Sequence, residues 1–149
     1  MISNKTKYGL HALIHLAKEY RKGPILIADL AREENIPKKF LESILLGLKN
    51  QGILESKKGK GGGYQLARHP RDIKFGQVIR ILDGPLAPVS CVSQTAYKKC
   101  KECKDENSCG ISLVMKDVRD AVANILDKTS LEDVIYKIKD MHKTENYQI

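Results

Sequence analysis

The sequence lacks a long apolar run, at its start or elsewhere. No stretch approaches the roughly 20 apolar residues that cross a bilayer. Lys5, Lys7 and Lys18 interrupt the segment where a secretory signal would be apolar. These absences predict a cytoplasmic protein with no membrane partner. Thiols stay reduced in the cytoplasm, so clustered cysteines there more often bind metal or respond to redox change than form structural disulfides.

Acidic residues and enzyme motifs are also scarce. Lysine and arginine number 26 against 18 aspartates and glutamates, and the formal net charge of +8 favours a polyanion such as nucleic acid as partner. No nucleophile–base pair, phosphate-binding loop or carboxylate dyad is recognisable, so we do not expect an enzyme. The 149 residues, 42% of them hydrophobic, suffice for one domain that buries its own core.

Residue periodicity predicts a mainly α fold with a small β-hairpin. Helices are expected at residues 3–20, 27–34, 37–50 and 75–82, and strands at 53–57 and 64–67. Ser3 is expected to cap the first helix, and Asn35 to turn the chain between the second and third. The third helix is expected to bury Phe40, Leu41, Ile44, Leu45 and Leu48. This order predicts a winged helix-turn-helix domain over residues 1–83.

The C-terminal part divides into three segments. Residues 84–110 hold all the cysteines and lack helical periodicity, which predicts a loop organised by what its cysteines bind. Residues 111–139 are expected to form a long amphipathic dimerisation helix, ending near Leu126, and a short last helix that Ser130 caps and that ends near Ile138. Residues 140–149 are polar and are expected to be a flexible tail.

Basic residues gather where a winged helix would meet double-stranded DNA. The candidate contacts of the recognition helix are Lys38, Lys39, Glu42 and Ser43. They occupy the first turns of the third helix, the part of a helix-turn-helix that reaches base edges. Lysine can donate to guanine, and a glutamate can accept from the amino group of cytosine.

The hairpin supplies the second set of DNA candidates, which are Lys57, Lys58, Lys60, Gly61, Gly62 and Tyr64. Glycines let the loop turn sharply with positive φ and bring backbone N–H groups close to phosphate. The lysines add charge, and one of them can enter the minor groove.

The cysteines form the other candidate site. Cys91, Cys100, Cys103 and Cys109 follow the pattern C-x8-C-x2-C-x5-C, and the rest of the chain has no cysteine. Four thiolates suit an iron–sulfur cluster or tetrahedral zinc. The irregular spacing favours a labile cluster over a zinc site, and metal-free redox thiols are the third alternative. The surrounding lysines, at positions 98, 99, 101 and 104, are expected to lower the pKa values of the thiols.

Four segments share the motifs of one protein family. They read KYGL at 7–10, IPKKFLE at 36–42, GKGGGY at 59–64 and VIRILDGP at 78–85. These motifs resemble the bacterial winged-helix regulators that include IscR, NsrR, RirA and CymR, and the resemblance extends over about residues 1–135. It implies a homodimeric transcription regulator, expected to be a repressor, that binds operator DNA. Glu42 matches the glutamate of the family's recognition helix, and Lys58 stands where IscR-like proteins carry an arginine that enters the minor groove.

The resemblance also implies a cofactor. Cluster-binding members hold an iron–sulfur cluster with three cysteines, which Cys91, Cys103 and Cys109 match. The fourth ligand varies in the family: a histidine at the position of Ser112, or an aspartate at the position of Lys7. This chain has neither a histidine nor an aspartate at these positions, so we expect Cys100 to be the fourth ligand. The resemblance favours a 2Fe–2S cluster over 4Fe–4S.

The expected signal is iron supply, redox status or nitric oxide. The alternatives are a metal-free thiol/disulfide repressor and a winged-helix protein whose structural zinc site supports binding to a protein partner.

Overall fold

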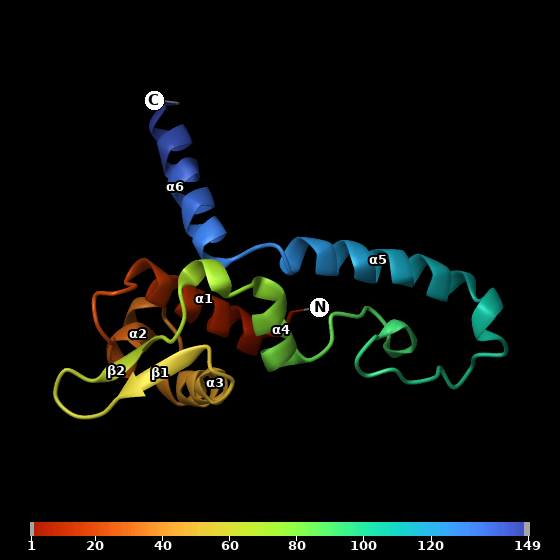
Figure 1. Cartoon of the computed structure of the whole chain (residues 1–149), viewed down its shortest axis with the longest axis horizontal. Helices are drawn as coiled ribbons and strands as arrows, with labels where there is room; N and C mark the ends of the chain where they lie inside the picture. Colours follow the sequence, from red (N-terminus) through yellow and green to blue (C-terminus); the bar gives the residue numbers. More distant parts are fainter. Residues whose placement is uncertain (1, 148–149) are drawn as a thin grey trace.

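Six α-helices and one β-hairpin make up the computed structural model, which describes residues 2–147. The elements are α1 (Asn4–Lys18), α2 (Ile27–Glu33), α3 (Lys38–Asn50), β1 (Leu54–Lys57), β2 (Gly63–Leu66), α4 (Phe75–Asp83), α5 (Gly110–Leu126) and α6 (Leu131–Tyr147). Helices α1 to α4 pack together beside the hairpin, and α5 and α6 project from this body in different directions (Figure 1). The expected fold class, mainly α with a β-hairpin wing, is confirmed.

Helix α1 is anchored at its start to the end of α4. The Ser3 hydroxyl accepts a hydrogen bond from the N–H of Thr6 at 3.2 Å, which is the expected N-cap. The same hydroxyl donates to Asp83 at 2.5 Å, and the Ser3 N–H donates to the second Asp83 oxygen at 2.9 Å. Burial of Asp83 opposes the charged form, but these hydrogen bonds outweigh it and lower its pKa.

Asn35 forms the turn of the helix-turn-helix. Its φ of +55° is a left-handed conformation that asparagine tolerates better than most residues, and the next N–H, of Ile36, donates to Ala31 at 2.9 Å. The turn directs the apolar face of α3 into the core, where Leu41, Ile44, Leu45 and Leu48 are fully buried. Phe40 differs from the expectation: it is 38% exposed and only its edge contacts the Tyr8 ring.

The hairpin is bonded to the loop before α2. Strands β1 and β2 pair antiparallel from Leu54–Leu66 to Lys57–Gly63. Tyr64 also exchanges two backbone hydrogen bonds with Ile25, at 2.8 and 2.9 Å. This isolated bridge ties β2 to the loop before α2, so that only the tip of the hairpin, residues 58–62, projects.

A charged joint connects α5 to α4. Arg80 donates two hydrogen bonds to Asp127, at 2.6 and 2.9 Å. Gly76 lies directly below, where a Cβ would be 2.0 Å from an Asp127 oxygen, so a larger residue would displace the carboxylate. Backbone bonds from Phe75 to Thr129 and from Leu131 to Ile73 hold the chain beyond α5 against the body.

Helix α6 begins as expected and ends later. The Ser130 hydroxyl accepts from the N–H of Asp133 at 3.1 Å, and Asp133 accepts from the Ser130 N–H at 2.9 Å, a reciprocal cap. The helix then continues to Tyr147 instead of ending near Ile138, so residues 140–147 of the expected tail are helical. Residues 148–149 lie outside the described part. Among the described helices, none combines the length and the apolar character needed to cross a bilayer.

The joint predicts a pH-dependent stability. The hydrogen bond from Arg80 lowers the pKa of Asp127 in the folded protein. The ionised Asp127 therefore contributes to the free energy of unfolding above the pKa that it has in the unfolded chain. This contribution is lost as pH falls through the pKa of Asp127 in the folded protein. Because both side chains are about two-fifths exposed, we expect Asp127→Asn to cost about 1 kcal/mol at neutral pH, and less in acid. Urea unfolding of both proteins across pH measures this. Asp117→Asn, on the same helix, is the control, and an equal loss there would contradict the prediction.

Candidate DNA-binding surface and cysteine loop

The exposed side of α3 carries the expected polar residues. Lys38, Lys39, Glu42 and Ser43 are all exposed on its first two turns, opposite the buried leucines. The Ser43 hydroxyl donates to the carbonyl of Phe40 at 2.9 Å, which leaves its oxygen free only as an acceptor. No side chain caps the N-terminus of α3, so its first N–H groups are available to a phosphate. Three of these side chains, two positive and one negative, can therefore reach a groove.

The wing, residues 57–64, combines exposed lysines with a tightly folded tip. Gly59 and Gly61 have φ of +86° and +75°, which glycine adopts without strain. Gly62 is buried, and a Cβ there would be 2.2 Å from the carbonyl oxygen of Lys57. Its N–H donates to Gly59 at 3.0 Å. The N–H of Gly62 therefore closes the loop and is not free for phosphate, contrary to the expectation.

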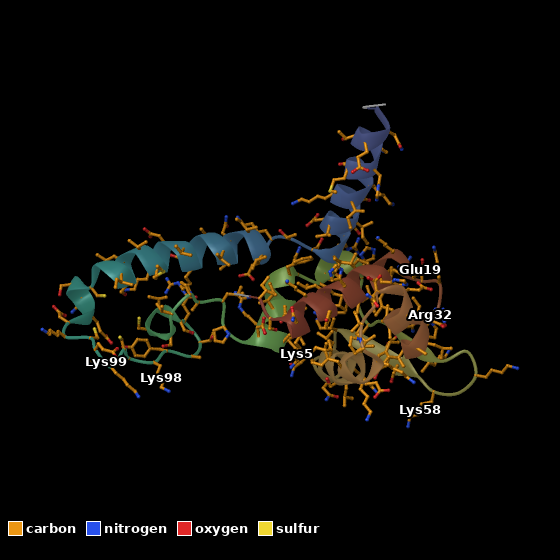
Figure 2. The ribbon with its side chains drawn as sticks, turned by 180° about the vertical axis from the view of Figure 1, so that it is seen from behind. Lys5, Glu19, Arg32, Lys58, Lys98 and Lys99 are labelled. Carbon is orange, nitrogen blue, oxygen red and sulfur yellow. The ribbon has the colours of Figure 1, made fainter. Side chains whose placement is uncertain are left out.

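The basic side chains of the wing point outward. Lys57, Lys58 and Lys60 are exposed, and Figure 2 shows Lys58 on the side of the molecule where α3 lies. Tyr64 is half-buried at the base of the wing, packed against the core, with both backbone groups bonded to Ile25. Its visible role is to anchor the wing, and a contact between Tyr64 and DNA stays a prediction.

All four cysteines line one cavity. It has a volume of about 740 Å³ and lies between residues 89–107 and the start of α5. Cys109 is the N-cap of α5 and accepts from the N–H of Ser112 at 3.5 Å. Cys100 and Cys103 share a turn, in which the N–H of Cys103 donates to the carbonyl of Cys100 at 3.2 Å. The loop therefore gathers the thiols although they are up to eighteen positions apart in sequence.

The thiols share the cavity without meeting at one point. Within residues 2–147, no three side chains of the histidine, cysteine, aspartate or glutamate type are close enough together to hold a metal ion. The donor set still fits one, because four thiols are the ligands that iron–sulfur clusters and structural zinc use. Ser112, at the position of the family's histidine ligand, also lines this cavity, whereas Lys7 is not among its lining residues.

The pKa of one thiol shifts in the direction opposite to the expectation. Burial, and then the neighbouring Cys109, raise the pKa of Cys103, and the opposing effect of Lys99 is smaller. The expectation that the lysines lower the thiol pKa values is therefore wrong for Cys103. The Tyr97 hydroxyl donates to Glu106 across the cavity mouth, and this bond raises the pKa of Tyr97 to about 12.

Arg119 connects the cysteine loop, residues 84–110, to the middle of α5. Its guanidinium donates to the carbonyl of Val92 at 2.7 Å and to Asp120 at 2.9 Å, and its side chain is only 17% exposed. Val92 follows Cys91 and is 2% exposed. Sequence reasoning missed this contact. In the sequence Arg119 looks like any other charged residue of an amphipathic helix, and only the folded position of the Val92 carbonyl distinguishes it.

Comparison with known proteins agrees with this geometry. Residues 2–137 match the family described as Rrf2, iron-dependent transcriptional regulator. A Rhodobacter capsulatus protein described as an rrf2-like HTH-type transcriptional regulator is 40% identical over 138 residues, which cover 91% of this chain and 92% of that protein.

Two solved structures have the same fold. CymR, the global cysteine regulator of B. subtilis, superposes with a TM-score of 0.75 at 34% identity, covering 90% of this chain and 95% of CymR. IscR of T. potens gives the same TM-score at 28% identity, with 95% and 90% covered. The relatives named here are transcription regulators and not enzymes, and the chain belongs to the Rrf2 family of winged-helix transcriptional regulators.

Proposed function

We propose that this regulator is a homodimeric repressor whose affinity for operator DNA depends on an iron–sulfur cluster held by Cys91, Cys100, Cys103 and Cys109. The observation that supports this most directly is that all four cysteines line one cavity at the start of α5. The recognition set is that of α3 and the wing, in which Gly62 is buried and Tyr64 is half-buried. The cluster, 2Fe–2S in preference to 4Fe–4S, would supply a charge and a ligation state that change with iron supply, oxidants or nitric oxide.

The dimer is supported by the exposed face of α5. Ile111, Val114, Val118, Ala121 and Ile125 follow the alternating three- and four-residue spacing of a coiled-coil seam. Three of them, Ile111, Val114 and Ile125, are 57 to 68% exposed, and Ser112 is the only buried residue of this helix. A helix packed on its own domain would bury this face, so a second copy of the chain is the occupant that we propose.

A metal-free disulfide switch is the second candidate. It is favoured by the absence of a converged metal site in the described residues and by the likeness to CymR, which is described as the global cysteine regulator of B. subtilis. Cys100 and Cys103, in one turn, are the pair that we expect to react. An oxidant would take up the two electrons that the thiols release with their protons. Visible absorption with iron, sulfide and zinc analysis on protein purified without oxygen separates the candidates, including a colourless structural zinc site.

The DNA surface predicts two different mutant phenotypes. Glu42→Ala should change base preference in a binding-site selection, because Glu42 is the exposed acidic residue of α3.

Lys58→Ala should weaken binding to all sequences and lower the slope of log K against log salt by about 1, because it removes one phosphate contact. Lys143→Ala, on α6, is the control for lost charge. Equal binding of the unmodified protein to all sequences would contradict the specificity.

The cysteine set predicts the effect of removing Cys100. We expect Cys100→Ser to lose iron or to shift the visible charge-transfer bands, because a hydroxyl is a poorer cluster ligand than a thiolate. The measurement is the absorption spectrum and iron content of protein purified without oxygen. Ser108→Ala, in the same loop, is the matched control. Full occupancy with an unchanged spectrum would rule out Cys100 as the fourth ligand.

The seam predicts that one charge dissociates the dimer. Ile125→Asp should weaken dimerisation by roughly two to three orders of magnitude. In a twofold-symmetric dimer the substitution occurs in both copies, so the interface loses two apolar contacts and buries two charges. Asn124→Asp adds the same charge beside the seam and should leave the dimer intact. Analytical ultracentrifugation at several concentrations measures both. An unmodified protein that is monomeric throughout would refute the dimer.

A further inference from the structure

The cysteine loop has unpaired positive charge although its sequence is nearly balanced. Its three acidic residues are engaged inside the loop. Glu102 accepts from the Cys100 thiol at 3.2 Å, Asp105 accepts from Asn107 at 3.0 Å, and Glu106 accepts from the Tyr97 hydroxyl. The four lysines of the loop, Lys98, Lys99, Lys101 and Lys104, are exposed, and none of them forms an ion pair within residues 2–147. The acidic groups therefore accept hydrogen bonds from neutral donors inside the loop, whereas the ammonium groups remain free to bind an anion.

Two of these lysines face the same way as the DNA-binding surface. In Figure 2, Lys98 and Lys99 extend from the loop on the side where α3 lies and where Lys58 extends from the wing. Lys5 lies between the two sites on that side. Helix α6 rises on the opposite side of the molecule. These lysines thus lie on one side of the view in Figure 2, at the wing, the start of α1 and the cysteine loop.

We propose that Lys98 and Lys99 bind the phosphate backbone of the same DNA duplex that α3 and the wing hold. The inference rests on the proposed DNA-binding function and adds a contact element to it. Lysine suits this task, because an ammonium on a long flexible side chain neutralises phosphate without reading a base. Glutamates that are already hydrogen-bonded in the loop add less repulsion than free ones would.

The length of α5 sets the place of this contact. Its 17 residues extend about 25 Å, which corresponds to roughly seven base pairs of B-DNA. The cysteine loop starts at the end of α4 and runs beneath α5 to the start of that helix, away from the joint at Arg80 and Asp127. Lys98 and Lys99 would therefore meet phosphates outside the base pairs that α3 reads.

This arrangement places the sensor and a DNA contact in one loop. Cys100 is flanked by Lys99 and Lys101; Lys101 lies within the turn that joins Cys100 to Cys103, and Lys99 directly precedes it. A change at the thiols that alters this turn also moves the lysines. DNA affinity can then change through phosphate contacts while the base preference of α3 stays the same.

The test compares Lys98→Ala/Lys99→Ala with Lys137→Ala/Lys143→Ala in the full chain. Both double variants lose two positive charges, but the control pair lies on α6. Binding to a labelled duplex of mixed sequence is measured against salt concentration, with the thiols reduced and no metal added. We expect the loop variant to lower the slope of log K against log salt by about two and the control to leave it unchanged. Hydroxyl-radical footprints on a selected operator should lose protection at phosphates outside the α3 contact.

Each outcome has one meaning. Equal slopes for the loop variant and the unmodified protein, with unchanged footprints, would overturn the inference and leave the proposed function intact. Equal losses in both variants would also overturn it, because they would show a general effect of net charge. An unmodified protein that does not bind DNA at any salt concentration, whether metal-free or loaded with an iron–sulfur cluster, would refute the proposed function itself. A changed base preference in the loop variant would contradict a contact made only to phosphate.

Discussion

The apolar face of α5 is largely exposed in the part of the chain that the structure describes, and most other features of the molecule depend on this. A helix of 17 residues that buries only Ser112 is held at its two ends and by Arg119 at its middle. At one end Arg80, Asp127 and Gly76 fix it to α4, and at the other the cysteine loop folds back beneath it. Apolar residues at coiled-coil spacing cost free energy in water, which a second copy would remove. The interface that would stabilise α5 then also sets how far apart two recognition helices lie.

The cysteine loop is held by polar contacts and not by a core. Val92 and Ser93 are buried against α5, and Arg119 fixes this turn through the Val92 carbonyl. Beyond it, residues 94–108 are exposed except for Cys100's turn partner Cys103, and few hydrogen bonds join them to the rest of the chain. Such a segment opens at low free-energy cost, which suits a site that must gain or lose a ligand. The four thiols are close enough to share a cavity, and ligation would have to draw them together.

Local signals made most of the fold predictable. Ser3, Asn35 and the Ser130–Asp133 pair act through hydrogen bonds within five residues, so the sequence reveals them directly. The predicted buried residues of α3 are confirmed except for Phe40, which contacts the Tyr8 ring at the margin of the core. Helical periodicity does not show where the core ends. The length of α6 was underestimated, since residues 142–146 are polar and exposed and lack an apolar period.

The candidate site was predictable in its residues and not in its arrangement. The spacing of the cysteines indicated one site, but the depth of burial that raises the pKa of Cys103 depends on how the loop folds. Arg119 and Val92 are 27 positions apart, and the Tyr97–Glu106 bond crosses the cavity mouth. Contacts of this kind come from tertiary structure, which no local pattern encodes. The role of Gly62 was misjudged for the same reason, since its N–H is used within the wing.

The distance along α5 limits how the thiols can influence DNA binding. Charges in solvent are screened beyond about 8 Å at physiological ionic strength, and α5 alone extends about 25 Å. A change of charge at the cysteines therefore has little direct effect on a base contact at Glu42. Coupling must pass either through the rigid helix and its joint at Arg80 and Asp127, or through contacts that the loop itself makes with DNA. The first route changes the spacing of the recognition helices and hence specificity, whereas the second changes affinity for any sequence. In both cases the effect on affinity equals the difference in binding free energy between the two states of the loop.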